Sequence, residues 1–183
     1  MCGELPGLNE RHVALLDGEK VLLRPLKGED AALYPEFLRD VTVEDLRLRF
    51  FAAMNEVSPA LIDKLVHYDP AHAIAFIAIE ERTGRMLGVV RLHDDRDGES
   101  AEFAVLVRSH LKGHGLGWVM MEHMIASAKA KGLKTIHGQV LDENRTMLQM
   151  CAELGFHVTE DPGEVGVKRA TLRLDSVPAA ANR

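Results

Sequence analysis

The sequence has few of the residues that define several large classes of protein. Its 183 residues include two cysteines, Cys2 and Cys151, which are far apart and lack metal-ligand spacing. The sequence therefore indicates neither a disulfide framework nor a zinc site, and we expect a reducing, cytoplasmic location.

Basic residues are not in excess, because the chain has 22 Lys and Arg and 28 Asp and Glu. Nucleic-acid-binding faces are basic, so we expect no nucleic-acid partner.

Targeting segments and repeats are also missing. The N-terminal stretch MCGELPGLNERHVALL has no basic region followed by an apolar one, and Cys2 stands where myristoylation requires glycine. We therefore expect no membrane partner. We find no internal repeat or low-complexity block. The length and a hydrophobic fraction of 46% predict one globular domain with a sizeable core.

Apolar patterns predict strands with helices between them. Strand patterns occupy residues 20–26, 72–80, 86–93, 100–107, 135–141 and 167–174. A helical pattern occupies residues 28–54, with a boundary at Pro35, and a second begins at Ser58 and Pro59. Two more follow residues 115 and 143, and the last of these ends at Gly155. Three consecutive strands, a βαβα run and a terminal strand pair predict a sheet that is antiparallel at first and parallel further on.

A glycine-rich loop, KGHGLG, joins the strand at residues 100–107 to the next helix. Glycines let bare backbone approach a ligand, and a helix N-terminus offers unpaired N–H groups and a positive dipole end. We therefore expect an anion there, most simply a phosphate. Trp118 and Val119 stand where a P-loop needs Lys and Ser or Thr, and the G-x-G-x-G spacing does not match the dinucleotide fingerprint.

The loop resembles motif A of the GNAT acetyltransferase superfamily, [QR]-x-x-G-x-[GA], with Lys112 at its first position. The stretch VLDENRTMLQMCAELGFHV is similar to the second signature of that family, a strand, an Asn at a helix start and L-G-F. LLDGEKVLLRPLKGEDAALYPEFL and EDLRLRFFAAM, together with the loop, resemble the GNAT domain of bacterial Pat-type protein lysine acetyltransferases.

The resemblance covers about residues 17–175, which leaves 1–16 as an N-terminal extension and 176–183 as a C-terminal tail. It implies an α/β fold with a mixed central sheet of six to seven strands, flanked by helices and splayed at the acetyl-CoA site. We expect Gly138 to help the strands part.

Acetyl-CoA is the co-substrate that the resemblance implies, with no metal. The pyrophosphate of acetyl-CoA is expected to bind the N–H groups of the loop, and its pantetheine arm is expected to lie along the preceding strand. The resemblance also implies that Asn144, at the start of the next helix, contacts the cofactor. An N–H near Val105 or Leu106 is also placed to polarise the thioester carbonyl. The candidate cofactor-binding residues are Val105, Leu106, Val107, Lys112, Gly113, His114, Gly115, Leu116, Gly117, Trp118 and Asn144.

Glu102 is the candidate general base. A lysine ammonium, with a pKa of about 10.4, must lose a proton before it attacks a thioester. Family members with a glutamate base carry it on this strand, and we expect burial beside Phe103 to help Glu102 accept the proton through a water. The alternative is a rim carboxylate with no role in the chemistry. Cys151 aligns with the tyrosine general acid of many relatives, but a buried structural cysteine is the commoner case, so it stays outside the predicted catalytic set.

The expected reaction is acetyl transfer to an amine, a protein lysine by resemblance. A small-molecule amine acceptor and a non-catalytic acyl-CoA sensor stay open, as does a homodimer. Arg47 and Arg49 are expected near the acceptor entrance or paired with acids. The hairpin HDDRDGESAE, residues 93–102, is either an acidic rim that attracts a lysine or an ordinary solvated turn.

Overall fold

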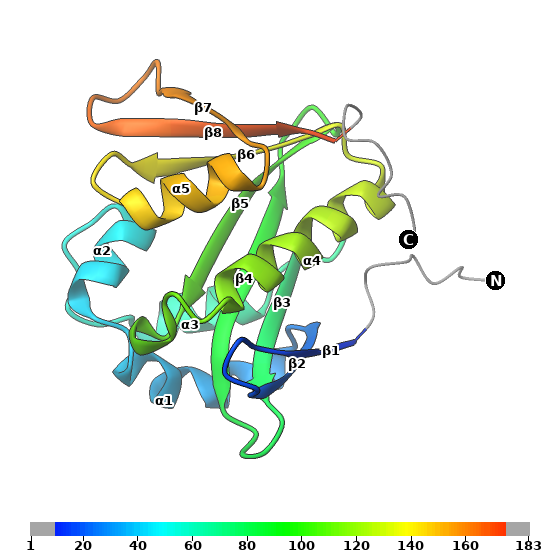
Figure 1. Ribbon diagram of the computed structural model, residues 1–183, viewed down its shortest axis with the longest axis vertical. Coiled ribbons are helices and arrows are strands. Elements are labelled where there is room, and N and C mark those ends of the chain that lie inside the picture. Colours follow the sequence, from blue (N-terminus) through cyan, green and yellow to red (C-terminus); the bar gives the residue numbers. More distant parts are fainter. Residues whose placement is uncertain (1–9, 175–183) are drawn as a thin grey trace.

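The computed structural model describes residues 10–174 as a mixed sheet with helices on both faces (Figure 1). Its strands run in the order β1-β2-β3-β4-β5-β6-β8-β7, and β5 and β6 form the parallel pair in an otherwise antiparallel sheet. The strands are β1 (Arg11–Ala14), β2 (Lys20–Pro25), β3 (Ala73–Glu80), β4 (Met86–Asp94), β5 (Ser100–Val107), β6 (Thr135–Leu141), β7 (His157–Glu160) and β8 (Val167–Arg173). The predicted change from antiparallel to parallel pairing is therefore confirmed.

The part of the chain that the structure describes has eight strands, more than the expected six to seven. The additional strand β1 has four residues, three of them exposed, and falls within the segment 1–16 expected to be an extension. A strand this short and exposed has no apolar alternation, so its pairing with β2 defines it. Cys2 and the predicted tail 176–183 lie outside the described residues.

The helices follow local signals in the sequence. They are η1 (Gly28–Leu33), α1 (Tyr34–Arg39), α2 (Val43–Phe50), α3 (Pro59–Val66), η2 (Ser109–Leu111), α4 (Leu116–Lys131) and α5 (Arg145–Glu153). The predicted cap is confirmed at α3, where the Ser58 hydroxyl accepts a hydrogen bond from the N–H of Leu61 at 3.2 Å. Asn144 caps α5 in the same way.

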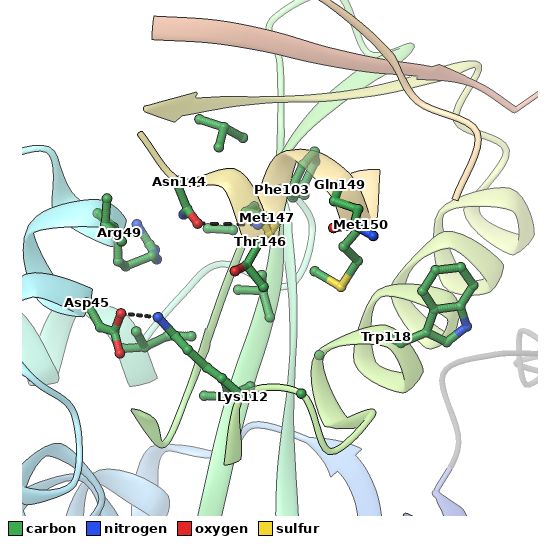
Figure 2. Close-up of a pocket in the computed structure, with 18 of the residues that line it drawn as sticks. Asp45, Arg49, Phe103, Lys112, Trp118, Asn144, Thr146, Met147, Gln149 and Met150 are labelled. Carbon is green, nitrogen blue, oxygen red and sulfur yellow. Dashed lines mark hydrogen bonds and ion pairs between the residues drawn. The ribbon is translucent and has the colours of Figure 1, made fainter. Parts of the chain in front are cut away.

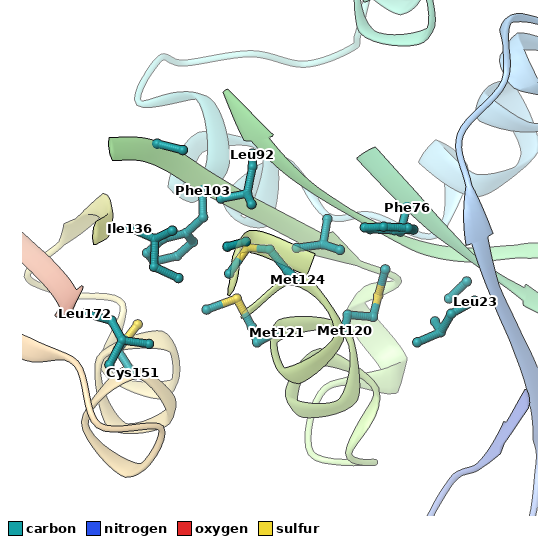
Figure 3. Packing of buried hydrophobic residues seen from close by; sticks show 14 of the residues in the cluster. Leu23, Phe76, Leu92, Phe103, Met120, Met121, Met124, Ile136, Cys151 and Leu172 are labelled. Carbon is teal, nitrogen blue, oxygen red and sulfur yellow. The ribbon is translucent and has the colours of Figure 1, made fainter. Parts of the chain in front are cut away.

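Each face of the sheet buries a separate apolar cluster. Along β3, Phe76 and Ala78 pack toward α4 and α5, while Ala75, Ile77 and Ile79 pack toward α1, α2 and α3. This alternation is the period of two that a strand imposes. The three central methionines of α4, Met120, Met121 and Met124, are almost fully buried against Phe76, Leu92 and Phe103 (Figure 3).

The parallel pair separates soon after it forms. β5 and β6 pair only from Ser100 to Glu102, although β5 continues along β4 to Val107 and β6 continues along β8 to Leu141. Two strand edges therefore face each other without a ladder between them. At the branch, a Cβ on Gly138 would lie 2.7 Å from the Phe103 ring, and that ring packs edge-on against Phe156 at 5.2 Å. Glycine at position 138 therefore leaves the space that the Phe103 ring occupies where β5 and β6 separate.

Candidate active site

A cleft of about 820 Å³ lies where β5 and β6 have separated (Figure 2). Its walls are β5, the glycine loop with the first turn of α4, the cleft-facing side of α5, and the last turn of α2. The opening is therefore lined partly by backbone edges and partly by side chains from elements far apart in the chain.

The glycine loop has the backbone conformation that the sequence pattern predicts. Gly113 and Gly115 have φ values of 84° and 89°, in the left-handed region that favours glycine, and Gly115 directly precedes the 16-residue helix α4. The first N–H groups of that helix have no partner within it. Gly117 differs, because its φ is ordinary and a Cβ there would meet Met150 Sδ at 3.6 Å, a normal contact. Glycine at position 117 is therefore not required by the backbone.

Most of the predicted cofactor residues line the cleft: Val105, Leu106, Val107, Lys112, Gly113, His114, Gly115, Gly117, Trp118 and Asn144. The exception is Leu116, which is fully buried in the core and does not line the cleft. Figure 2 shows the Trp118 ring on the side of α4 that faces away from Lys112. The Asn144 side-chain oxygen accepts a hydrogen bond from the N–H of Met147 at 3.3 Å.

Lys112 has a partner that the sequence did not reveal. Its ammonium forms an ion pair with Asp45 on α2, and the Ser109 hydroxyl donates to the same carboxylate. Burial alone would raise the pKa of Asp45, but these contacts lower it below its ordinary value. Asp45 therefore ties the glycine loop to α2 and neutralises the lysine. It was missed because it lies 67 positions from Lys112 in the chain.

Glu102 lies on the wall of the cleft at the last residue where β5 still pairs with β6. Its neighbours in register are His93 on β4 and His137 on β6. The side chain is exposed, so the expectation of burial beside Phe103 is wrong. Alternation along β5 explains this, because Phe103 packs toward α4 and α5, whereas Glu102 and Leu106 belong to the opposite face.

Cys151 lies in the core, not on the cleft (Figure 3). Burial raises the pKa of its thiol to about 12. A thiol with no exposed surface does not reach a leaving thiolate.

The carboxylates of the acidic hairpin, residues 93–102, form ion pairs or hydrogen bonds with nearby residues. Asp94 pairs with Lys131, Asp95 with His137 and Glu99 with Lys134, while Asp97 accepts from the N–H groups of Glu99 and Ser100. None of these four carboxylates lines the cleft. The hairpin therefore fits the solvated-turn alternative better than an acidic rim at the site.

The two arginines of α2 have different surroundings. Arg47 is bound by Glu44 and by Glu143, the residue before the α5 cap. Arg49 lines the cleft on the same wall as Asp45, and its guanidinium lies over the Phe50 ring at 4.7 Å. The sequence predicted that these arginines lie near the acceptor entrance or pair with acids. Arg47 pairs with acids, and Arg49 lies on the cleft wall.

Comparison with known proteins identifies the family. Residues 20–157 match the family model described as an acetyltransferase (GNAT) domain. The chain is 32% identical over 153 residues to an acetyltransferase of Pseudomonas aeruginosa, with 82% of each chain covered. The chain therefore belongs to the GNAT acetyltransferases, which use acetyl-CoA.

More distant matches include two Pat proteins and one enzyme that is named for its acceptor, spermidine. The acetyltransferase Pat of Mycolicibacterium smegmatis is 27% identical over 168 residues, 91% of this chain but 50% of that protein. The solved GNAT domain of S. lividans PAT superposes with a TM-score of 0.83 at 26% identity and covers 90% of this chain and 96% of that domain. Spermidine N-acetyltransferase from Vibrio cholerae, solved with CoA and spermine, shares the fold with a TM-score of 0.67 at 19% identity, covering 85% of this chain and 96% of that one.

No helix within residues 10–174 is both long and apolar enough to span a membrane. The same residues hold no cluster of three or more His, Cys, Asp or Glu side chains arranged to bind a metal ion.

Proposed function

We propose that this protein transfers the acetyl group of acetyl-CoA to a lysine side chain of a protein, with Glu102 as the general base. The observation that carries the proposal is the position of Glu102. It ends the paired part of β5, so its carboxylate lies on the cleft wall beside the first unpaired residues of that strand. A base there is next to any ligand that follows the free edge of β5.

The cleft suits a ligand with a long polar arm and a diphosphate. The unpaired edge from Phe103 to Val107 offers N–H and C=O groups that pair with an extended chain as another strand would. The turn from Gly113 to Trp118 offers N–H groups and the positive end of the α4 dipole. In this proposal main-chain groups hold the pyrophosphate, and Lys112 supports the loop through Asp45.

The chemistry assigned to Glu102 is removal of one proton from the acceptor. The neutral amine attacks the thioester carbonyl, and an N–H of the β5 edge near Val105 or Leu106 stabilises the oxyanion. The C–S bond then breaks, CoA leaves as its thiolate, and the second proton of the amine goes to that thiolate through solvent. Because Glu102 is exposed, one ordered water between the carboxylate and the amine is a reasonable path for the proton.

Similarity to the two Pat proteins supports the choice of a protein lysine. A small-molecule amine is the second candidate, because a relative with the same fold is a spermidine acetyltransferase. A non-catalytic acyl-CoA sensor is the third. Acetyl-CoA turnover against a panel of lysine peptides, proteins and polyamines separates the three, since a sensor binds acetyl-CoA without releasing CoA.

Glu102→Gln tests the base. We expect acetyl-CoA affinity to be retained while kcat falls by about 10²–10⁴-fold, because the amide accepts no proton. The loss should shrink at high pH, where more of the acceptor is already neutral. Glu122→Gln, an exposed position on α4 away from the cleft, is the matched control. Normal turnover by Glu102→Gln at neutral pH would remove Glu102 from the mechanism.

A further inference from the structure

Two arginines lie next to Glu102 without a carboxylate of their own. Arg49 makes no hydrogen bond or ion pair with any residue from 10 to 174. Arg91 on β4 donates one N–H to the carbonyl of Leu65 at 2.7 Å and meets no carboxylate among the same residues. Arg91 is opposite Ala104 in the β4–β5 register, so it is on the same face of the sheet as Glu102.

A third donor completes this group. Tyr34 on α1 is 1% exposed, and its hydroxyl makes no hydrogen bond of normal geometry. Burial raises the pKa of Tyr34, and the neighbouring Arg91 guanidinium acts in the opposite direction. A cavity of about 10 Å³, room for about one water, is lined by Tyr34, Arg49 and Arg91 together with Leu106. Arg49, Phe50 and Leu106 line both this inner space and the large cleft, so these three residues separate the two.

Two arginines elsewhere in the described chain, Arg24 and Arg108, have little exposed side-chain surface and are neutralised. Arg24 is held by both oxygens of Asp30, and Arg108, with no exposed surface, is bound by Glu36 and Asp40. Arg49 has no such counter-ion, and burial, followed by repulsion from Arg91, lowers its pKa to about 10, although Tyr34 and Glu102 act in the opposite direction. Arg49 is half-buried on the cleft wall, so its charge has lost part of its hydration without gaining a counter-ion, and a ligand carboxylate would supply one.

We propose that Arg49, with Arg91 and the Tyr34 hydroxyl behind it, binds a carboxylate of the acceptor substrate while Glu102 faces its amine. This rests on the proposed acetyl transfer and narrows its acceptor class. A planar guanidinium binds a carboxylate in a two-pronged geometry that an amide does not reproduce. The carboxylate has two sources, an acidic residue beside a target lysine in a peptide or the α-carboxylate of a free amino acid. A polyamine, which carries only positive charge, fits this wall poorly.

The test compares acceptors that differ only in one carboxylate. The first pair is the capped dipeptides Lys-Glu-amide and Lys-Gln-amide, and the second is free lysine and lysine amide. We expect kcat/KM of the wild type to favour the carboxylate member of at least one pair by about 10- to 100-fold, the range of one charge-assisted hydrogen bond, mostly through KM. In Arg49→Met the preference should fall to about twofold or less. Arg47→Met is the matched control, since it removes the same charge two residues away and should retain the preference.

A binding measurement makes the result independent of turnover. Calorimetry of the CoA-saturated wild type with the Nε-acetylated forms of the four compounds should show the same preference, lost in Arg49→Met. Preference in the dipeptide pair assigns the carboxylate to a flanking acidic residue, and preference in the lysine pair assigns it to the amino acid. Either result supports the inference. If transfer fails with every amine but the calorimetric preference is present, the proposed function fails and the carboxylate site stands.

Three results would overturn the inference. The first is equal kcat/KM and equal binding within both pairs in the wild type. The second is an equal loss of preference in Arg47→Met and Arg49→Met, which would assign the effect to net charge. The third is a shifted pH profile in Arg49→Met with the acceptor preference unchanged, which would mean that Arg49 acts only on Glu102.

Discussion

Cys151 and Glu102 both stand on elements that border the cleft, yet only Glu102 reaches it. Alternation along β5 turns Glu102 toward the face shared with Arg91, whereas the helical position of Cys151 turns the thiol toward Leu172 and the α4 methionines. At the scale of single residues, the direction of a side chain separates a group that faces the cleft from a group that packs in the core.

The surroundings of Cys151 predict how substitutions there behave. Cys151→Ser should lower the free energy of unfolding by about 1–3 kcal/mol, because a hydroxyl in this apolar site has no partner. Cys151→Ala should cost less than the serine variant, and neither should change kcat or its pH profile. Chemical denaturation and acetyl transfer measured on the same samples check this. A stable Cys151→Ala with a large loss of kcat would instead mean that the thiol donates a proton.

At the scale of elements, the glycine loop contains glycines that the backbone requires and one that it does not. Gly113 and Gly115 need positive φ to bring the chain from η2 into α4. Gly117 has no such need, and Met150 leaves room for a methyl group. If glycine matters at position 117, the reason is the ligand.

Three variants separate these requirements. Gly115→Ala should lose about 1–3 kcal/mol of stability to backbone strain and should bind acetyl-CoA weakly. Gly117→Ala should be as stable as the wild type yet bind acetyl-CoA less tightly, because the methyl group stands near the N–H groups of the first turn. His114→Ala should bind nearly normally. Thermal unfolding and calorimetric titration give the two readouts.

Two results would contradict this account of the loop. Normal affinity in Gly117→Ala would show that the pyrophosphate does not approach the first turn of α4. A loss in His114→Ala as large as that in the glycine variants would mean that side chains, not main-chain groups, hold the cofactor.

At the scale of the whole molecule, one histidine among residues 10–174 is buried, and its protonation is linked to folding. His123 on α4 is 5% exposed, its Nε2 has no hydrogen-bond partner, and its ring packs edge-on against Phe76 at 4.4 Å. Burial, with a smaller contribution from Arg11, lowers its pKa below the ordinary value. The folded protein therefore holds His123 neutral where the unfolded chain begins to protonate it.

The sign of this linkage fixes a pH dependence. The unfolded state binds the proton first as pH falls below about 6.5, so the contribution of His123 to stability is present above that pH and is lost progressively below it. His123→Leu should lose less stability than the wild type between pH 7 and pH 5. Denaturant unfolding at each pH, compared between the two proteins, isolates this group from the exposed histidines. Parallel stability curves would show that His123 does not take part.

The strands β2 to β6 and β8 could be located from the sequence because their apolar residues alternate or run together between turn residues. The glycine loop, the Ser58 cap and the helix ended by Gly155 could be located because backbone geometry and capping are local. β1 could not, since an exposed four-residue strand has no pattern until β2 pairs with it.

The sequence by itself determined the family, the order of elements and the glycine loop before α4, all of which depend on residues close together in the chain. Tertiary structure decided which side chains meet across the cleft: Asp45 with Lys112, and Arg49 with Arg91 and Tyr34 beside Glu102. It also decided the exposure of Glu102 and the burial of Cys151. The physical reason is range, because capping, turns and periodicity act over a few residues, whereas charge pairing and burial depend on which distant segments the fold brings into contact.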